Sequence, residues 1–496
     1  MTRLERTLSQ TKLPARYARL ALEMRLDDLE LRLLVDPDAN DAAFERACIL
    51  AALGRNDDAT QAYHAILARS PEHFGALNNL GMLLYESGAH RAALQAYELL
   101  VERHPDSAIA HTHVAKLLHD QGRAEDAVAH YERAIALDPS AASAHHGLAT
   151  ILSERGDEAA ATRERRLGFT HRPVTFRRYR GEGEALRVLL VGVDGEGNVP
   201  MQSFLDDKLF ATASLIVDFY DIAASLPPHD IVFNAIGDAD RCALALTSAN
   251  AMLAETTAPI LNPPATVLAT GRVGNAERLG TLTDVVAPRF AIFPRWLLQQ
   301  TDPAGALTAS GFDWPVLLRA PGFHTGEHFI KVDDPAQAGA AIATLPGTAV
   351  MAIAFLDTRD SSGMFRKYRV ITVDGKIYPL HLAISKDWKV HYFSADMVDV
   401  PEHRALDAAF LEDPQATVGA RGFAALERIV EALALDYGGI DFSVDDNGRV
   451  VLFEANATMI VQPPPADAIW DYRRKPVERI IKAFQGMLRT RALSRG

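Results

Sequence analysis

Two acidic residues and one amide near the end of the chain have the spacing of a divalent-cation site. Asp441 lies in an alternating apolar run, and Glu454 and Asn456 end the β-branched run that follows the turn residues 445–448. This pattern predicts a hairpin that brings Asp441 near Glu454. Residues two apart on a strand share a face, so Glu454 and Asn456 point the same way. Carboxylate and amide oxygens suit Mg²⁺, which takes further ligands from water and phosphates.

A strand aspartate followed by a turn and Glu-x-Asn at the end of the next strand resembles the metal-binding signature of the ATP-grasp superfamily. The resemblance implies that Asp441, Glu454 and Asn456 hold the magnesium ions that bridge the phosphates of ATP. Taken alone, the hairpin is equally compatible with ordinary polar residues at the ends of a buried strand.

A second segment has features of a phosphate-binding loop. Arg319 ends a predicted strand, and residues 322–326 follow as a short loop with a glycine at each end. Glycine allows positive φ and close backbone approach, so amide groups can converge on an anion. A plain hairpin loop is the alternative. The ATP-grasp resemblance implies a phosphate-binding set of Arg272, Arg319, Gly322, His324, Thr325 and Gly326, with Arg319 in place of the commoner lysine.

Two strand segments complete the resemblance. Residues 350–357 read as an apolar strand and hinge, where Phe355 and Leu356 would contact adenine, although Ala354 stands where the family commonly has glutamate. Residues 365–378 predict a hairpin around an Asp-Gly turn. Arg366, Lys367 and Arg369 gather positive charge on its first strand. The resemblance implies that Arg369 occupies the family position that meets the transferred phosphate. A cation suits this position, because phosphoryl transfer needs positive groups that stabilise the moving phosphate. A solvated basic strand edge is the alternative for Arg366.

The polar segment 381–392 is dense in groups that can bind a polar substrate. Its spacing defines no catalytic triad. We therefore treat His381, Lys386 and His391 as substrate-pocket candidates.

A period of 34 residues organises the first third of the chain. Gly54, Gly88, Gly122 and Gly156 follow this step, and so do four prolines and four alanines. Each unit reads as helix, glycine turn and helix, which resembles the tetratricopeptide repeat (TPR). We expect a helical cap over residues 1–40 and repeats over residues 41–175.

The TPR resemblance implies a concave surface that binds a peptide or a protein partner. Dimerisation, or support of the second half of the chain, are the alternatives. His111, His113, His145 and His146 lie on the first helices of two repeats. Their offsets do not stack on one helix face, which favours solvated polar residues of the groove over a metal site.

Alternating strands and helical stretches over residues 186–300 predict an open α/β layer. This layer is similar to the pre-ATP-grasp substrate domain, and residues 301–490 would then form an α+β ATP-grasp catalytic domain. The expected fold is thus multidomain: an all-α TPR solenoid, the α/β domain and the nucleotide-binding domain.

Composition restricts the class of protein further. The 496 residues carry a formal net charge of −13, which argues against nucleic-acid binding. Two cysteines exclude a disulfide framework, and no apolar run has the length of a membrane span. We expect a cytoplasmic protein without membrane contact, with a homodimer possible.

The resemblance to ATP-grasp enzymes implies an ATP- and Mg²⁺-dependent ligase. It would convert a substrate carboxylate to an acyl phosphate, which an amine or hydroxyl nucleophile then attacks. The attached repeats favour a peptide or protein substrate. The alternatives are a kinase on the same scaffold and a non-catalytic TPR scaffold whose second half only senses ATP.

Overall fold

The computed structural model describes residues 15–300, 302–321, 328–390, 392 and 395–493. The chain divides into two compact units, one of residues 1–174 with 182–184 and one of residues 175–181 with 185–496. Five of the predicted site residues lie outside the described residues: Gly322, His324, Thr325, Gly326 and His391.

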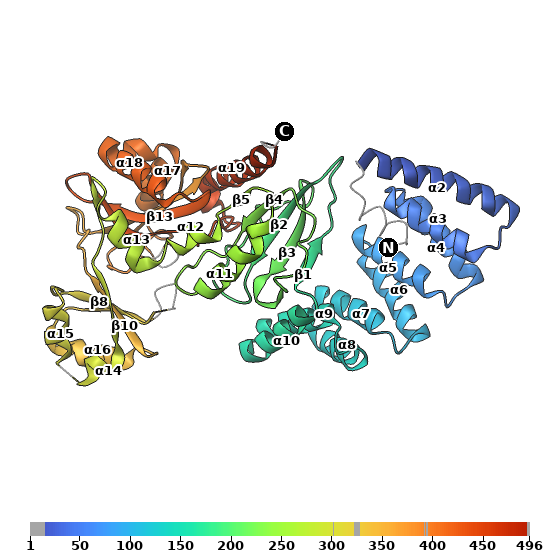
Figure 1. Ribbon diagram of the computed structural model, residues 1–496, viewed down its shortest axis with the longest axis horizontal. Helices are drawn as coiled ribbons and strands as arrows, with labels where there is room; N and C mark the ends of the chain where they lie inside the picture. Colours follow the sequence, from blue (N-terminus) through green and yellow to red (C-terminus); the bar gives the residue numbers. More distant parts are fainter. Residues whose placement is uncertain (1–14, 301, 322–327, 391, 393–394, 494–496) are drawn as a thin grey trace. The chain divides into compact units, whose positions relative to one another are not determined.

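The first unit is a helical solenoid (Figure 1, blue to cyan). A long helix, α2 (Ala15–Val35), precedes four helix pairs whose first helices begin 34 residues apart. The pairs are α3 (Asn40–Ala52) with α4 (Asn56–Arg69), α5 (Phe74–Glu86) with α6 (His90–Arg103), α7 (Ala108–Asp120) with α8 (Ala124–Leu137), and α9 (Ala142–Glu154) with α10 (Glu158–His171).

The repeat signals have direct structural causes. The four spaced glycines all adopt φ between 77° and 83°, a conformation that favours glycine at these turns. At Gly81, an added Cβ would lie 2.7 Å from the ring of Tyr97, so only glycine lets α5 and α6 approach this closely. The predicted solenoid is therefore confirmed.

The prediction of solvated groove histidines is wrong for two of the four. His111 and His145 are 8% and 3% exposed, and each ring bonds the carbonyl of the proline six residues earlier, Pro105 or Pro139. A buried polar ring needs such a partner, because an unpaired one would lose its bonds to water. These histidines tie the start of a helix to the preceding turn.

The second unit contains three sheets. The first is mainly parallel, in the order β1 (Val174–Arg177), β3 (Phe210–Ile216), β2 (Leu186–Gly192), β4 (Ile231–Asn234) and β5 (Ile260–Leu261). Its main helices are α11 (Ala243–Met252) and α12 (Pro264–Leu268), followed by α13 (Arg272–Leu279). The expected α/β layer is present.

The second sheet is antiparallel, in the order β7 (Phe290–Pro294), β10 (Ala349–Ala354), β8 (Val316–Arg319) and β9 (Phe329–Val332). It packs with α14 (Arg295–Gln300), α15 (Pro303–Ala309) and α16 (Ala338–Thr344) around a core of their own. Since β7 precedes residue 300, this sheet draws strands from both sides of the expected domain boundary.

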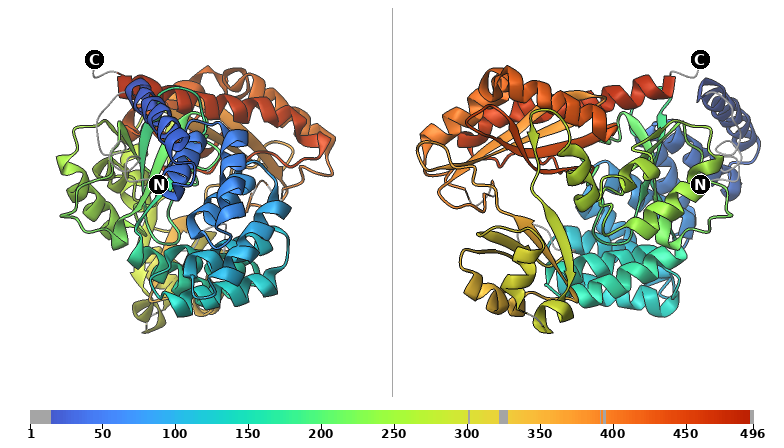
Figure 2. Two further views of the ribbon diagram at one scale, coloured as in Figure 1. Left: turned by 90° about the vertical axis from the view of Figure 1, so that its right-hand side faces the viewer. Right: turned by 60° about the vertical axis from the view of Figure 1, so that its left-hand side comes forward.

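The third sheet has the order β12 (Lys376–Ser385), β11 (Phe365–Val373), β13 (Tyr437–Val444), β14 (Val450–Asn456) and β6 (Val285–Val286). Both predicted hairpins belong to it, as β11 with β12 and as β13 with β14. Its helices are α17 (Pro401–Glu412), α18 (Pro414–Leu433) and α19 (Arg474–Leu493), the last preceded by the 3₁₀ helix η4 (Ala468–Arg473). The second and third sheets form separate lobes, in yellow and orange (Figure 2, right).

One core joins the first and third sheets. Phe204, Phe233, Tyr437 and Phe484 make edge-to-face contacts with ring centroids 5.0–6.2 Å apart. Fully buried Asn262, just after β5, donates to the Tyr437 carbonyl at 2.7 Å and accepts from the Tyr437 amide at 2.9 Å. These contacts fix the start of β13 and, through it, the position of Asp441.

Candidate functional site

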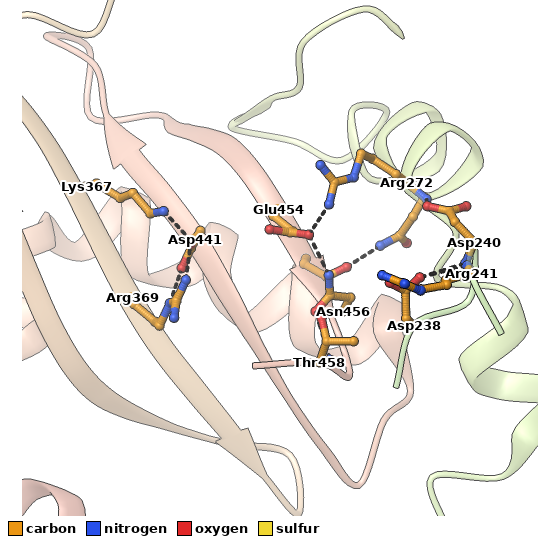
Figure 3. Close-up of polar contacts among 12 residues, drawn as sticks. Asp238, Asp240, Arg241, Arg272, Lys367, Arg369, Asp441, Glu454, Asn456 and Thr458 are labelled. Carbon is orange, nitrogen blue, oxygen red and sulfur yellow. Dashed lines mark hydrogen bonds and ion pairs between the residues drawn. The ribbon is translucent and has the colours of Figure 1, made fainter. Parts of the chain in front are cut away.

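Three charged residues form a row across the third sheet. Arg369 on β11 is in register with Asp441 on β13, which is in register with Glu454 on β14 (Figure 3). A register shift directly after Asp441 gives β14 one extra residue, Phe453, beside Glu454. The pairing brings together three residues that the sequence separates by up to 85 positions.

Asp441 is the buried centre of this row. It is 1% exposed, and its carboxylate accepts from Arg369 Nε at 2.5 Å and Nη2 at 2.7 Å, with Lys367 Nζ at 2.6 Å. Burial alone would raise the pKa of Asp441, but the two cations hold this pKa well below its ordinary value. Asp441 therefore remains a carboxylate throughout the physiological pH range.

Glu454 is the second carboxylate. Its Oε1 lies 2.5 Å from Nη2 of Arg272 on α13 and accepts from Asn456 Nδ2 at 2.9 Å. The Asn456 oxygen in turn accepts from the amide and hydroxyl of Thr458 at 2.9 and 2.7 Å. Asn275 bonds the Ala455 carbonyl at 2.6 Å, which anchors α13 against β14. Arg272 on α13 lies beside Glu454 (Figure 3).

A cleft of about 690 Å³ lies against this row, with a lining drawn from the second and third sheets. Eight of the predicted residues line it: Arg272, Arg319, Phe355, Leu356, Arg369, His381, Asp441 and Glu454. Among the described residues, its charged lining consists of six basic and two acidic side chains: Arg272, Arg319, Lys367, Arg369, Lys389 and Arg473 against Asp441 and Glu454. An excess of four positive charges in a protein of net charge −13 favours an anionic ligand.

The excess of positive charge affects the pKa of Arg319. Burial, followed by the positive charge of Arg272, lowers the pKa of Arg319 to about 10. Its guanidinium lies 5.6 Å from the centre of the Phe329 ring. A phosphate bound here would relieve the repulsion between the two arginines.

Another part of the cleft is apolar and aromatic. Trp388 makes edge-to-face contacts with Phe329 and Phe355 at 5.2 and 6.5 Å. Leu356, two residues after the end of β10, also lines the cleft. Flat apolar walls of this kind suit a purine base.

Two candidates lie outside the main cleft, and a third lies in it with an altered pKa. Lys386 lines a smaller neighbouring pocket with Lys331 and Arg359, not the main cleft. Asn456 lines a cavity of about 30 Å³ beside Glu454. His381, on β12, lies in the cleft and pairs in register with Arg369 on β11. Burial lowers the pKa of His381 well below its ordinary value, and the charges of Arg369 and Arg473 lower it further. Neutral at physiological pH, His381 can donate or accept one hydrogen bond without adding charge.

The donor set fits Mg²⁺ when phosphates supply further ligands. Among the described residues, no group of three or more His, Cys, Asp or Glu side chains is arranged to hold a metal ion. Asp441 and Glu454 supply only two carboxylates, both engaged by cations, and the Asn456 amide oxygen is engaged by Thr458. Mg²⁺ typically binds through one or two carboxylates together with substrate phosphates. Binding of the metal with a nucleotide is therefore expected to be much tighter than binding of the metal alone.

Sequence reasoning gave no role to four residues that line the cleft: Lys367, Trp388, Tyr392 and Arg473. Lys367 had a usable signal, because it precedes Arg369 by two positions and so shares its face of the strand. Arg473 had none, since it lies in a segment that reads as an amphipathic packing helix.

Comparison with known families identifies the class of the first unit. Residues 33–108 match the family described as tetratricopeptide repeat, and residues 115–156 match the TPR repeat. This region therefore consists of TPR repeats. No curated protein matches the chain.

Several solved structures are similar to part of this chain. MamA from Desulfovibrio magneticus RS-1 is 21% identical over 34% of this chain and 93% of its own, with a TM-score of 0.29. Another MamA crystal structure is 16% identical over 29% of this chain and 85% of its own, with a TM-score of 0.28. YrrB, described as a TPR protein with an unusual peptide-binding site, is 18% identical over 31% and 79%, with a TM-score of 0.27. No helix in the described parts of the chain has the length and apolar character needed to cross a membrane.

Proposed function

We propose that the second unit is an ATP-grasp ligase that binds Mg·ATP in the cleft lined by its second and third sheets. The observation that carries the proposal is the row of Arg369, Asp441 and Glu454 at the base of a basic cleft of about 690 Å³. Two carboxylates for a metal, cations for phosphates and aromatic walls for a base occur together there.

Each part of the cleft would have a distinct task. Asp441, Glu454 and Asn456 would hold Mg²⁺, which when bound neutralises charge on the phosphates. Arg272 and Arg319 would bind phosphate oxygens through their planar guanidinium groups. Arg272 is paired with Glu454, and the positive charge of Arg272 acts on Arg319. A bound phosphate would offer both arginines a negative partner and reduce the repulsion between them.

The proposed reaction is transfer of the γ-phosphoryl group to a substrate carboxylate. The carboxylate oxygen bonds to phosphorus as the bond to ADP breaks, which gives an acyl phosphate. An amine or hydroxyl then attacks the acyl carbon and releases inorganic phosphate. Arg369, held rigidly by Asp441, would stabilise the transferring group, and positioning would supply most of the acceleration.

The TPR repeats suggest a protein or peptide partner, since stacked repeats present extended concave binding surfaces. We propose that they recruit the peptide or protein on which the ligase acts. The repeats could bind a segment of that substrate that is distant in sequence from the reacting carboxylate.

The test is calorimetric titration with Mg·ATP of the full chain and of Glu454→Ala. We expect binding to the wild type and at least a tenfold loss in the variant, with little change for Glu478→Gln, an exposed carboxylate on α19. Folded protein that binds no Mg·ATP would overturn the proposal. Binding without ADP formation across a panel of acids and amines would favour the ATP-sensing scaffold, and a stable phosphorylated product would favour the kinase.

A further inference from the structure

One basic residue of the cleft has no role in the site described above. Arg473, the last residue of η4, is 6% exposed and lines the cleft on the side of His381 and Tyr392. Among the described residues its guanidinium makes no hydrogen bond or ion pair, and its Nε is buried without a partner. Its Cζ lies 4.1 Å from the centre of the Tyr392 ring.

This arrangement is costly for a structural residue. A buried arginine is normally paired, because it gives up its bonds to water. The charge of Arg473 acts on Asp407, whose carboxylate already accepts from the Leu382 amide, the Tyr392 hydroxyl and the Tyr472 hydroxyl at 2.7, 3.1 and 2.7 Å. Within the described part of the chain, Asp407 and Arg473 thus interact through charge without a hydrogen bond, and Nε of Arg473 stays unpaired.

The surroundings of Arg473 indicate the kind of ligand. Tyr392 packs against Arg473, and the lining of the same cleft includes the apolar residues Met459, Ile460 and the prolines at 463–465, with Thr458 and Gln462 as polar members of that segment. Tyr392 is fixed by Asp407 and packs on His381, with ring centres 4.5 Å apart. An anion bound at Arg473 would therefore belong to a molecule with an apolar body.

The position of Arg473 separates it from the proposed phosphate site. His381 on β12 is in register with Arg369, and the charges of both Arg369 and Arg473 act on its ring. Asp441 and Glu454 lie on the opposite side of Arg369, on β13 and β14. Arg473 therefore lies beyond Arg369, on the side away from the two carboxylates.

We propose that Arg473 binds a carboxylate of the acyl substrate, and that this substrate is a carboxylic acid with an apolar body seated on Tyr392 and residues 463–465. The carboxylate is either the one to be phosphorylated or a second one on the same molecule. This inference rests on the proposed ligase function and adds the class of acid that the cleft accepts.

The test is ligand-observed NMR on the full chain with Mg·ADP present. The probes are 3-phenylpropionate, its neutral amide, and the diacid phenylsuccinate. We expect at least one acid to bind, the amide not to bind, and Arg473→Gln to weaken acid binding at least about tenfold. Arg489→Gln, which removes an exposed arginine on α19, is the matched control.

The two acids distinguish the sources of the carboxylate. Binding of 3-phenylpropionate that depends on Arg473 identifies the carboxylate to be phosphorylated, whereas binding of phenylsuccinate alone identifies a second carboxylate. The inference is overturned if neither acid binds, if acid and amide bind equally, or if Arg473→Gln leaves acid binding unchanged.

Mg·ATP calorimetry of Arg473→Gln and Arg473→Lys separates this inference from the proposed function. We expect both variants to keep wild-type Mg·ATP affinity, which also reports that they fold. Loss of Mg·ATP binding in folded Arg473→Gln would assign Arg473 to the nucleotide and overturn the inference. Failure of Mg·ATP binding in the wild type would overturn the ligase proposal itself.

Discussion

The two units of this protein place their polar residues by different means. In the TPR unit, His111 and His145 bond carbonyls only six residues away, so local contacts fix these two buried polar groups. In the second unit, Arg272, Arg369 and Glu454 meet across up to 182 residues of sequence. Local contacts tolerate change in a neighbouring repeat, whereas the cleft depends on every strand keeping its register. The variants below test this contrast.

The largest expected effect is loss of the buried carboxylate at the centre of the row. Asp441→Ala leaves Arg369 and Lys367 without their counter-charge, and removing one partner of a buried pair costs about 3–5 kcal/mol. Urea unfolding measures the change. Glu478→Gln, in an exposed pair with Lys482, is the control and should unfold like the wild type. A change as small as that control in Asp441→Ala would mean that the row does not hold the third sheet together.

A smaller effect is expected for the phosphate arginines. Arg319→Gln removes a charge-assisted contact worth about 1.5–3 kcal/mol, which corresponds to a loss of Mg·ATP affinity of roughly 10- to 150-fold. Stability should not fall, because the pKa of Arg319 is already lowered by burial and by Arg272. Unchanged affinity by calorimetry would exclude Arg319 from the phosphate site.

The repeat unit should respond locally. Gly81→Val forces a side chain into the Tyr97 ring and should cost about 1–3 kcal/mol of repeat stability. Met82→Ala, at the exposed neighbouring position, should change stability by less than about 0.5 kcal/mol. Mg·ATP affinity should be unchanged in both variants. A loss of affinity in Gly81→Val would show that the two units are energetically coupled.

The smallest expected effect is the loss of folding stability that Asp441 contributes when the pH becomes acidic. Because the folded-state pKa of Asp441 is depressed, its stabilising contribution is present above the ordinary aspartate pKa and is lost as pH falls below it. The free-energy difference between wild type and Asp441→Asn should be constant from about pH 5 to 8. Below about pH 4 it should shrink by up to about 1.4 kcal/mol per pH unit. Urea unfolding at several pH values checks this, and shrinkage already near pH 6 would contradict the depressed pKa.

The sequence by itself determined the solenoid and the hairpins. The 34-residue step required a glycine with positive φ at each turn, and the helix pairs follow that step. Alternation around the turns at 374–375 and 445–448 predicted β11 with β12 and β13 with β14, because strand period and turn chemistry are local properties. Eight of the proposed site residues lie together in one cleft, while their roles stay predictions.

Only the tertiary structure decided how these elements meet. No local pattern indicates that Arg272 reaches Glu454, that Lys367 shares Asp441 with Arg369, or that Arg473 enters the cleft unpaired. The reason is physical: a period of two or 3.6 residues specifies which side of an element is buried, but not which distant element covers it. Burial by distant chain segments also set the pKa of Asp441, His381 and Arg319.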